Sequence, residues 1–252
     1  MSRNSHRFFI STFCCIDLPL NRALAALSDR TTSVEIMSDG LHNLLDDATA
    51  CAEHPFTYSV HSPSSEINIA AIGERIRVAS LDVLEDHLRV CTKIDASHMV
   101  VHPGITSYDQ VRSRSYHSLL RSLDQLECLQ EEYGVRICIE NMGGWECCHF
   151  RSPDLVPELV SRDLGFAFDC GHAQLNNNLD TFLSQKNLVH VHLHDNNGLN
   201  DEHSACGDGT INFPYVLQRL PEDAELVIET RDLTTVDRSI VYLERLGQGV
   251  IS

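Results

Sequence analysis

The sequence predicts a single (β/α)8 TIM barrel that covers residues 1–252. Three observations lead to this expectation. Short strand-like runs alternate with longer helical patterns, and there are eight such units, the number that closes a parallel barrel. The length of 252 residues matches the roughly 250 residues of a typical TIM barrel. No low-complexity segment or Pro/Gly-rich linker divides the chain.

The eight strands are expected where short runs are rich in β-branched and aromatic residues. In order, these runs are Phe8–Phe13, Ser33–Met37, Thr57–His61, Ser97–His102, Val135–Glu140, Gly165–Asp169, Leu188–Leu193 and Glu225–Glu229. Helical spacing of apolar residues fills the segments between them, most clearly in the leucines from Leu119 to Leu129. Two further helices are predicted over Glu66–Thr92 and Thr234–Leu246. Because helical crossovers join parallel strands, the sheet is expected to be parallel.

Alternation within the strands predicts which side chains point into the barrel. In the sixth strand Phe166 and Phe168 share the face turned to the helices, so Asp169 points inward. The same pattern turns Glu140 inward in the fifth strand and Glu229 in the eighth. These acids stand at the carboxyl ends of their strands, which is the end of a barrel where active sites lie.

Six consecutive strands, the third to the eighth, end in or near a side chain that can bind a metal. The six residues are His61, His102, Glu140, Asp169, His192 and Glu229. Three carboxylates brought together without a cation would repel one another and would be costly to bury. Mixed histidine and carboxylate donors suit Zn²⁺, Mn²⁺ or Fe²⁺ better than Ca²⁺ or Mg²⁺. The sequence therefore predicts a divalent metal site at the mouth of the barrel.

The loops after the sixth and seventh strands add three more candidate ligands. His172 follows the sixth strand, just past a glycine that lets the chain turn back over the mouth. Asp201 and His203 follow the seventh strand as a D-x-H pair. One residue of separation places both side chains on the same side of an extended segment, so the pair can chelate one ion.

Candidate substrate contacts are fewer and less specific. Arg231, two residues past Glu229, is the best placed residue for gripping an anionic group. His194 shares inward parity with His192, so it can contact substrate or hydrogen-bond to a ligand. Trp145 lies in the loop after the fifth strand, which either contacts substrate or packs over the barrel. For Glu35, which points inward in the second strand, a structural hydrogen bond is expected.

Several short runs carry a resemblance to a known family. They are Val100–Gly104, Ile139–Asn141, Phe168–His172, His192–Asp195, Asp201–His203 and Ile228–Thr230. In type and order they resemble the endonuclease IV and xylose-isomerase-like TIM-barrel superfamily (AP endonuclease family 2), over nearly the whole chain. The isomerase/epimerase branch holds one metal with residues that match Glu140, Asp169, His192 and Glu229. The resemblance implies that Glu140 and Glu229 would then also be the acid/base pair acting on a sugar.

The endonuclease IV branch implies a larger site, with nine ligands around three zinc ions. The five additional ligands match His61, His102, His172, Asp201 and His203. By this resemblance Glu140 would bridge the ion held by His61 and His102 to the ion held by Asp169, His192 and Glu229. The last three loop residues would hold the third ion. Such a cluster hydrolyses phosphoesters, because water shared by metal ions becomes hydroxide near neutral pH.

The chain departs from the endonuclease pattern in the loops that would contact DNA. Cys14–Asp17, Ser38–His42 and Ser62–Glu66 contain no Arg, Lys, Phe, Tyr or Trp to grip phosphates or stack on bases. His194 also stands where Asn or Lys is usual. A small phosphorylated or sugar-like substrate is therefore expected ahead of DNA. Three functions stay open, namely a phosphoester hydrolase, a sugar or sugar-phosphate isomerase/epimerase, and a metal- or ligand-binding barrel without catalysis.

Composition and charge limit the partners and the cellular location that we expect. The net charge of −17 argues against a large non-specific nucleic-acid surface, although metal ions would add positive charge locally. Ten cysteines without a CxxC pair are typical of reduced thiols in a cytoplasmic protein. No apolar run approaches the roughly 20 residues that span a bilayer. The basic N-terminal segment precedes only a short apolar stretch, so we expect no signal peptide, no membrane partner and a cytoplasmic location.

Overall fold

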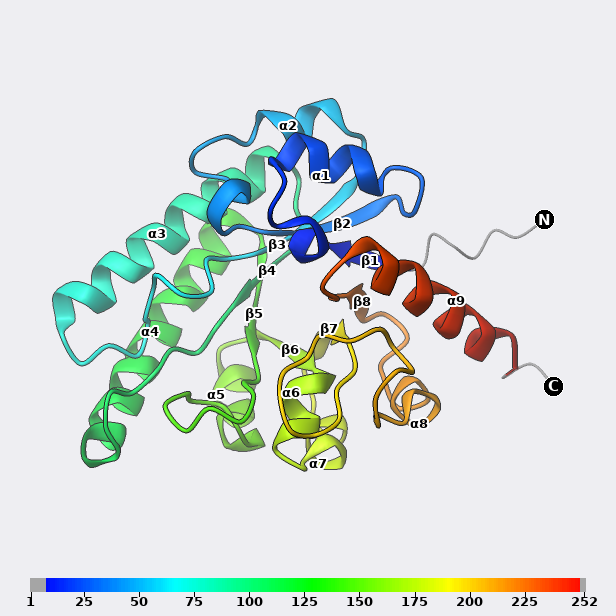
Figure 1. The fold of residues 1–252 in the computed structure, drawn as a ribbon. Coiled ribbons are helices and arrows are strands. Elements are labelled where there is room, and N and C mark those ends of the chain that lie inside the picture. Colours follow the sequence, from blue (N-terminus) through cyan, green and yellow to red (C-terminus); the bar gives the residue numbers. More distant parts are fainter. Residues whose placement is uncertain (1–7, 250–252) are drawn as a thin grey trace.

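Eight parallel strands close into a barrel in the computed structural model, which describes residues 8–249 (Figure 1). The strands are β1 (Phe9–Ser11), β2 (Ser33–Met37), β3 (Thr57–His61), β4 (His98–Val101), β5 (Arg136–Glu140), β6 (Gly165–Asp169), β7 (Leu188–Leu193) and β8 (Glu225–Ile228). Each strand pairs with the next, and β8 pairs with β1. The predicted TIM barrel is confirmed. Most of the basic N-terminal segment considered above, residues 1–7, lies outside the described residues.

Helices surround the barrel on the outside (Figure 1). They are α1 (Leu20–Leu27), α2 (Thr49–Glu53), α3 (Glu74–Lys93), α4 (Arg112–Tyr133), α5 (Val156–Ser161), α6 (Cys170–Leu175), α7 (Leu179–Leu183), α8 (Phe213–Leu217) and α9 (Leu233–Gly249). Within residues 8–249 there are also four short 3-10 turns, namely η1 (Thr12–Cys15), η2 (Gly40–His42), η3 (Asp109–Val111) and η4 (Pro153–Leu155). Between residues 8 and 249, no helix has the combined length and apolarity that crossing a membrane would require.

The first strand is shorter than predicted. Every other predicted strand agrees with the structure to within one residue at each end, but β1 ends at Ser11 and not at Phe13. The reason is local, because the Ser11 hydroxyl accepts a hydrogen bond from the backbone N–H of Phe13 at 3.3 Å. This bond caps the 3-10 turn η1 and turns the chain out of the sheet. Phe13 therefore lies in the loop at the barrel mouth.

The third helix also starts later than predicted, at Glu74 and not at Glu66. The Asn68 side-chain oxygen accepts hydrogen bonds from the backbone N–H groups of Ala70, at 3.1 Å, and of Ile105, at 3.0 Å. These bonds tie the segment to the loop after β4 in an irregular conformation. Gly73 then occupies the N-cap position of the helix. The helix predicted over Thr234–Leu246 is confirmed as α9.

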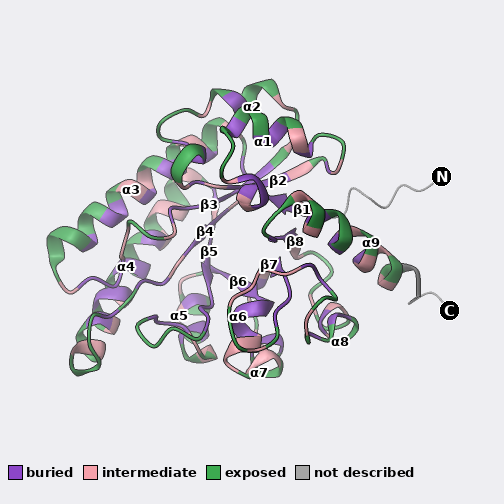
Figure 2. Ribbon diagram, viewed as in Figure 1, coloured by how far each residue is buried: buried purple, intermediate pink, exposed green. Residues whose placement is uncertain are grey.

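The predicted alternation of inward and outward side chains is confirmed. Phe166 of β6 packs against Phe182 of α7, with ring centroids 5.5 Å apart, in the main core between barrel and helices. Val100, Cys138 and Ala167 form a separate small cluster inside the barrel. Figure 2 shows the strands mostly buried, while the helices expose their outer faces. All ten cysteines are free thiols, as expected.

Candidate metal centre

Glu140 lies at the centre of the predicted ligands. From the end of β5, its Oε2 lies 2.9 Å from Nε2 of His102 and 3.3 Å from Nε2 of His61. Its other oxygen, Oε1, lies 3.0 Å from Nδ1 of His192. Three histidines, from β3, from β7 and from the residue after β4, thus lie within 3.3 Å of one carboxylate at the end of β5. The donor atoms of His61, His102 and Glu140 lie close enough together to hold one ion.

Two further carboxylates surround the same nitrogen of His192. Its Nδ1 lies 3.7 Å from Oδ2 of Asp169 and 3.6 Å from Oε2 of Glu229. Both acids are buried at the ends of β6 and β8, where the sequence pattern predicts them. Asp169 also caps helix α6, because its Oδ1 accepts a hydrogen bond from the backbone N–H of His172 at 2.6 Å. The cap fixes the carboxylate against the site.

The loop residues form a third group. Oδ2 of Asp201 lies 3.3 Å from Nε2 of His172 and 3.0 Å from Nε2 of His203. His203 adopts a left-handed backbone conformation, with φ of 43°, which a residue other than glycine rarely takes. Such strain persists where the surrounding structure imposes it, often at functional sites. All nine predicted ligands therefore converge on the barrel mouth.

Backbone carbonyls orient three of the histidine rings. Nδ1 of His61 donates to the Ser62 carbonyl at 2.7 Å, and Nδ1 of His203 donates to the Glu229 carbonyl at 2.9 Å. In the same way Nδ1 of His172 donates to the carbonyl of Asn141 at 2.9 Å. A carbonyl can only accept, so each Nδ1 carries the proton and each Nε2 is left free to bind a metal.

The pKa values of the predicted ligands depend strongly on one another. Burial would raise the pKa of Glu140, but His192 and His102 hold it well below its usual range. Burial would lower the pKa of His61, but contact with Glu140 raises it to about 9. In the same way Asp201 raises the pKa of His203 to about 9 against the effect of burial. Without an ion, protonated histidines thus balance the buried carboxylates.

The donor set fits divalent metal ions. Oε1 of Glu229 and Oδ1 of Asp201 are buried and have no hydrogen-bond partner among the described residues. Native proteins rarely leave such atoms unpaired unless an ion or a water satisfies them. Imidazole and carboxylate together are the ligands of zinc and related transition metals. Metal binding would release the protons that the histidines hold.

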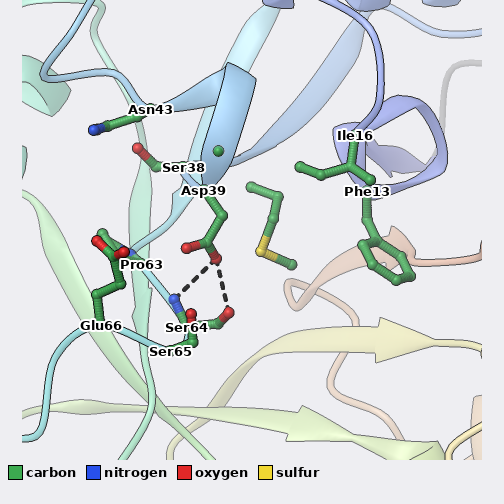
Figure 3. A pocket seen from close by; sticks show the side chains of 11 residues that line it. Phe13, Ile16, Ser38, Asp39, Asn43, Pro63, Ser64, Ser65 and Glu66 are labelled. Carbon is green, nitrogen blue, oxygen red and sulfur yellow. Dashed lines mark hydrogen bonds between the residues drawn. The ribbon is translucent and has the colours of Figure 1, made fainter.

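A pocket of about 570 Å³ opens at the mouth between the loops after β1, β2 and β3 (Figure 3). Asp39 joins the two later loops, because its Oδ2 accepts hydrogen bonds from the backbone N–H of Ser64 at 2.9 Å and from its hydroxyl at 2.7 Å. Phe13 lies across the pocket from Ser64 and Glu66 (Figure 3). The residues that line the pocket include no Lys or Arg.

Two aromatic side chains stand beside the third group of ligands. The Phe13 ring lies 4.9 Å from the ring of His203, and the Trp145 ring lies 5.6 Å from that of His172. Trp145 remains 46% exposed. Gly143 permits this approach, since a Cβ there would come within 2.8 Å of the tryptophan ring. The sequence pattern places Phe13 in the first strand, which is wrong. The sequence does carry a signal for Phe13 as a site residue, namely an aromatic side chain at the carboxyl end of a predicted barrel strand.

The remaining predicted site residues differ in their surroundings. His194 is fully buried, with Nε2 3.1 Å and 3.0 Å from the two oxygens of Asp169, and its ring stacks on His203 at 4.0 Å. Its contact with substrate stays a prediction. Arg231 is exposed just past β8, and its backbone N–H donates to the His203 carbonyl at 3.3 Å. Its role in gripping an anion also stays a prediction.

A family model described as "Xylose isomerase-like TIM barrel" matches residues 33–250. An uncharacterised protein of Methanocaldococcus jannaschii is 38% identical over 208 residues, which are 81% of this chain and 82% of the relative. A probable endonuclease 4 of Mycobacterium bovis is 26% identical over 217 residues, covering 80% and 84% of the two chains. The crystal structure of a D-tagatose 3-epimerase-like protein superposes with a TM-score of 0.87 at 26% identity, over 97% and 98% of the two chains.

Proposed function

The chain belongs to the xylose isomerase-like TIM-barrel family, and within this family we propose that it is a divalent-metal-dependent hydrolase of phosphoesters. In this proposal the site holds up to three ions, with zinc as the first choice and manganese or iron as alternatives. The similarity to a probable endonuclease 4 over 80% of the chain supports the proposed reaction class.

The observation that carries the proposal is the third group of ligands. His172, Asp201 and His203 meet at one carboxylate oxygen, at 3.3 Å and 3.0 Å. A mononuclear site needs only three or four protein ligands, and the group around Glu140 supplies these. A second cluster of matched imidazole and carboxylate donors beside it is explained by a site for several ions, which suits phosphoryl chemistry.

Each set of residues has a role in this proposal. His61, His102 and Glu140 would hold one ion, and Glu140 would share a second with Asp169, His192 and Glu229. His172, Asp201 and His203 would hold the third. Bound divalent ions would lower the pKa of water toward neutrality and stabilise charge on the attacking and leaving oxygens of a phosphoester. Phe13 and Trp145 would form the walls against which the substrate lies, and Arg231 would contact its anionic group.

Metal stoichiometry tests the proposal most directly. Anaerobically purified protein is loaded with Zn²⁺, freed of excess ion and assayed for metal per chain. We expect three ions in the native protein and two in His203→Ala. The matched control is Glu202→Gln, because the Glu202 carboxylate accepts hydrogen bonds from the backbone and the side chain of Asn197. It should keep three ions. A single bound ion in the native protein would contradict the proposal.

A second candidate function is a sugar or sugar-phosphate isomerase or epimerase. The similarity to a D-tagatose 3-epimerase-like structure, with a TM-score of 0.87, favours it. The pocket lined without Lys or Arg favours it as well. In this reading Glu140 and Glu229 would exchange protons with the sugar, and one ion would be held by Glu140, Asp169, His192 and Glu229.

Turnover separates the two candidates. The metal-loaded protein is assayed with an abasic-site DNA duplex and small phosphate esters, and in parallel with ketoses and ketose phosphates. The hydrolase proposal expects release of phosphate or cleavage of the duplex, lost in Glu140→Gln. Interconversion of sugars with one bound ion would support the second candidate. Absence of metal-dependent turnover on both panels would leave a binding barrel without catalysis.

A further inference from the structure

A second group of charged residues lies inside the barrel, behind the candidate metal centre. Glu35 of β2 and His190 of β7 are fully buried. His98 of β4 and Glu225 of β8 lie nearer the amino-terminal end of the barrel, where their side chains are 17% and 16% exposed. The interior of a TIM barrel is normally filled with apolar side chains, so these four residues require a physical explanation.

The four residues form a continuous chain of contacts that ends on a predicted metal ligand. Nδ1 of His98 lies 2.9 Å from Oε1 of Glu225, whose Oε2 lies 3.5 Å from Nδ1 of His190. Nε2 of His190 lies 2.7 Å from Oε2 of Glu35. The other oxygen of Glu35, Oε1, lies 3.1 Å from Nε2 of His192. Imidazoles and carboxylates thus alternate from the floor of the barrel to its metal centre.

His192 differs from the other histidines in how its ring is held. His61, His172 and His203 each anchor Nδ1 on a backbone carbonyl and turn Nε2 to the site. His192 does the opposite, with Nδ1 facing Glu140 at 3.0 Å and Nε2 facing Glu35. A ring presented in this way must carry its proton on Nε2, because the nitrogen that binds a metal must offer a lone pair.

Glu35 is placed to receive that proton in a hydrogen bond. Its Oε1 and Nε2 of His192 lie out of line in the described structure, and neither atom has another hydrogen-bond partner. Because a carboxylate can only accept, Nε2 of His192 is the donor in any hydrogen bond between them. The Ser59 hydroxyl donates to Oε2 of Glu35 at 3.4 Å, and His190 contacts the same oxygen, so the carboxylate is itself held in place.

We propose that Glu35 is a positioning residue of the metal centre, which fixes the orientation and the tautomer of His192 so that Nδ1 faces the metal. The proposal rests on the proposed function only in that a metal binds at Glu140 and His192, whatever the number of ions. His190, whose Nε2 lies 2.7 Å from Oε2 of Glu35, offsets the cost of removing this carboxylate from water. Residues that orient a ligand in this way typically change metal affinity 10- to 100-fold when they are mutated.

The test compares the two carboxylates of this chain of contacts, Glu35 and Glu225. Zn²⁺ affinity is measured on metal-free protein by competition with a chelator, for the native protein, Glu35→Gln and Glu225→Gln. We expect Glu35→Gln to weaken Zn²⁺ binding by about 10- to 100-fold. Glu225→Gln, which alters a carboxylate that contacts His190 and His98, should stay within about threefold of the native affinity. Equal affinity in Glu35→Gln and the native protein would overturn the proposal.

A second measurement needs no variant. In zinc-loaded native protein labelled with ¹⁵N-histidine, long-range ¹H–¹⁵N spectra report which ring nitrogen carries the proton. We expect the proton on Nε2 for His192 and on Nδ1 for His61, His172 and His203. A proton on Nδ1 of His192 would overturn the proposal even if Glu35→Gln does not fold. If the native protein binds fewer than three ions and Glu35→Gln still weakens Zn²⁺ binding, the proposed trinuclear site is contradicted and the role of Glu35 is supported.

Discussion

One carboxylate oxygen of Asp201 lies 3.0 Å from Nε2 of His203, although a single residue separates the two in the sequence. The left-handed backbone at His203 accompanies this close approach. The pair forms a small chelating unit on the loop after β7, which His172 completes from α6. Because Nε2 of His172 and Nε2 of His203 both face Asp201 and not Glu140, loss of this unit should affect one ion and leave the others bound.

Asp201→Asn tests this independence. The amide keeps the size of the side chain but loses the negative charge that a cation requires. We expect the protein to bind one ion fewer and to lose at least about 100-fold in kcat for phosphoester hydrolysis. Metal content and steady-state kinetics measure both. Loss of every ion together would show that the three groups are not independent.

The aromatic walls should determine substrate affinity. Phe13 and Trp145 pack on His203 and His172, and Trp145 is 46% exposed. Stacking of a ring on an aromatic side chain contributes about 1–3 kcal/mol. Trp145→Ala should therefore raise KM about tenfold with little loss of bound metal, measured with the best substrate found. Val160→Ala on α5, also exposed, is the control and should leave KM unchanged.

Gly171 should tolerate no larger residue. A Cβ at this position would lie 2.0 Å from the His194 ring, which in turn contacts Asp169. Gly171→Ala should lower the free energy of unfolding by about 1–3 kcal/mol and weaken metal binding, since His194 must move. Gly247→Ala in α9 is the control, because a Cβ there meets nothing within 4 Å. Removing a helical glycine should stabilise the protein by about 0.5–1 kcal/mol. Urea unfolding of the metal-free proteins distinguishes the two results.

His149 should make the metal-free protein less stable in acid. Burial and the neighbouring Arg112 lower the pKa of His149 to about 4, and its ring bonds to the Ser115 hydroxyl at 2.8 Å. The unfolded chain binds the proton near pH 6.5, so the contribution is complete above that pH and is lost as the pH falls toward 4. Between pH 7 and pH 5 the native protein should lose about 1 kcal/mol more than His149→Gln. Urea unfolding of both proteins in the presence of a chelator measures this loss of stability. An equal loss in the two proteins would contradict the prediction.

Many residues of the candidate site can be predicted from local patterns in the sequence. Strand alternation turns Glu140, Asp169 and Glu229 inward, and a strand of period two does so wherever it lies in the barrel. The D-x-H spacing of Asp201 and His203 likewise predicts their shared ligand group. By contrast, the position of Phe13 depends on one side-chain bond at Ser11, which a pattern of apolar residues does not record.

By itself, the pattern of residues in the sequence determined the barrel and the convergence of six donors at its mouth, because both follow from patterns repeated within each strand. The family resemblance raised the predicted set to nine donors. Only the tertiary structure decided which nitrogen of each histidine faces the site. It also decided that Glu35 lies behind His192, since β2 and β7 are not neighbours in the sheet and meet only across the closed interior. Closure of the barrel brings these residues together, and no single segment of the sequence predicts their contacts.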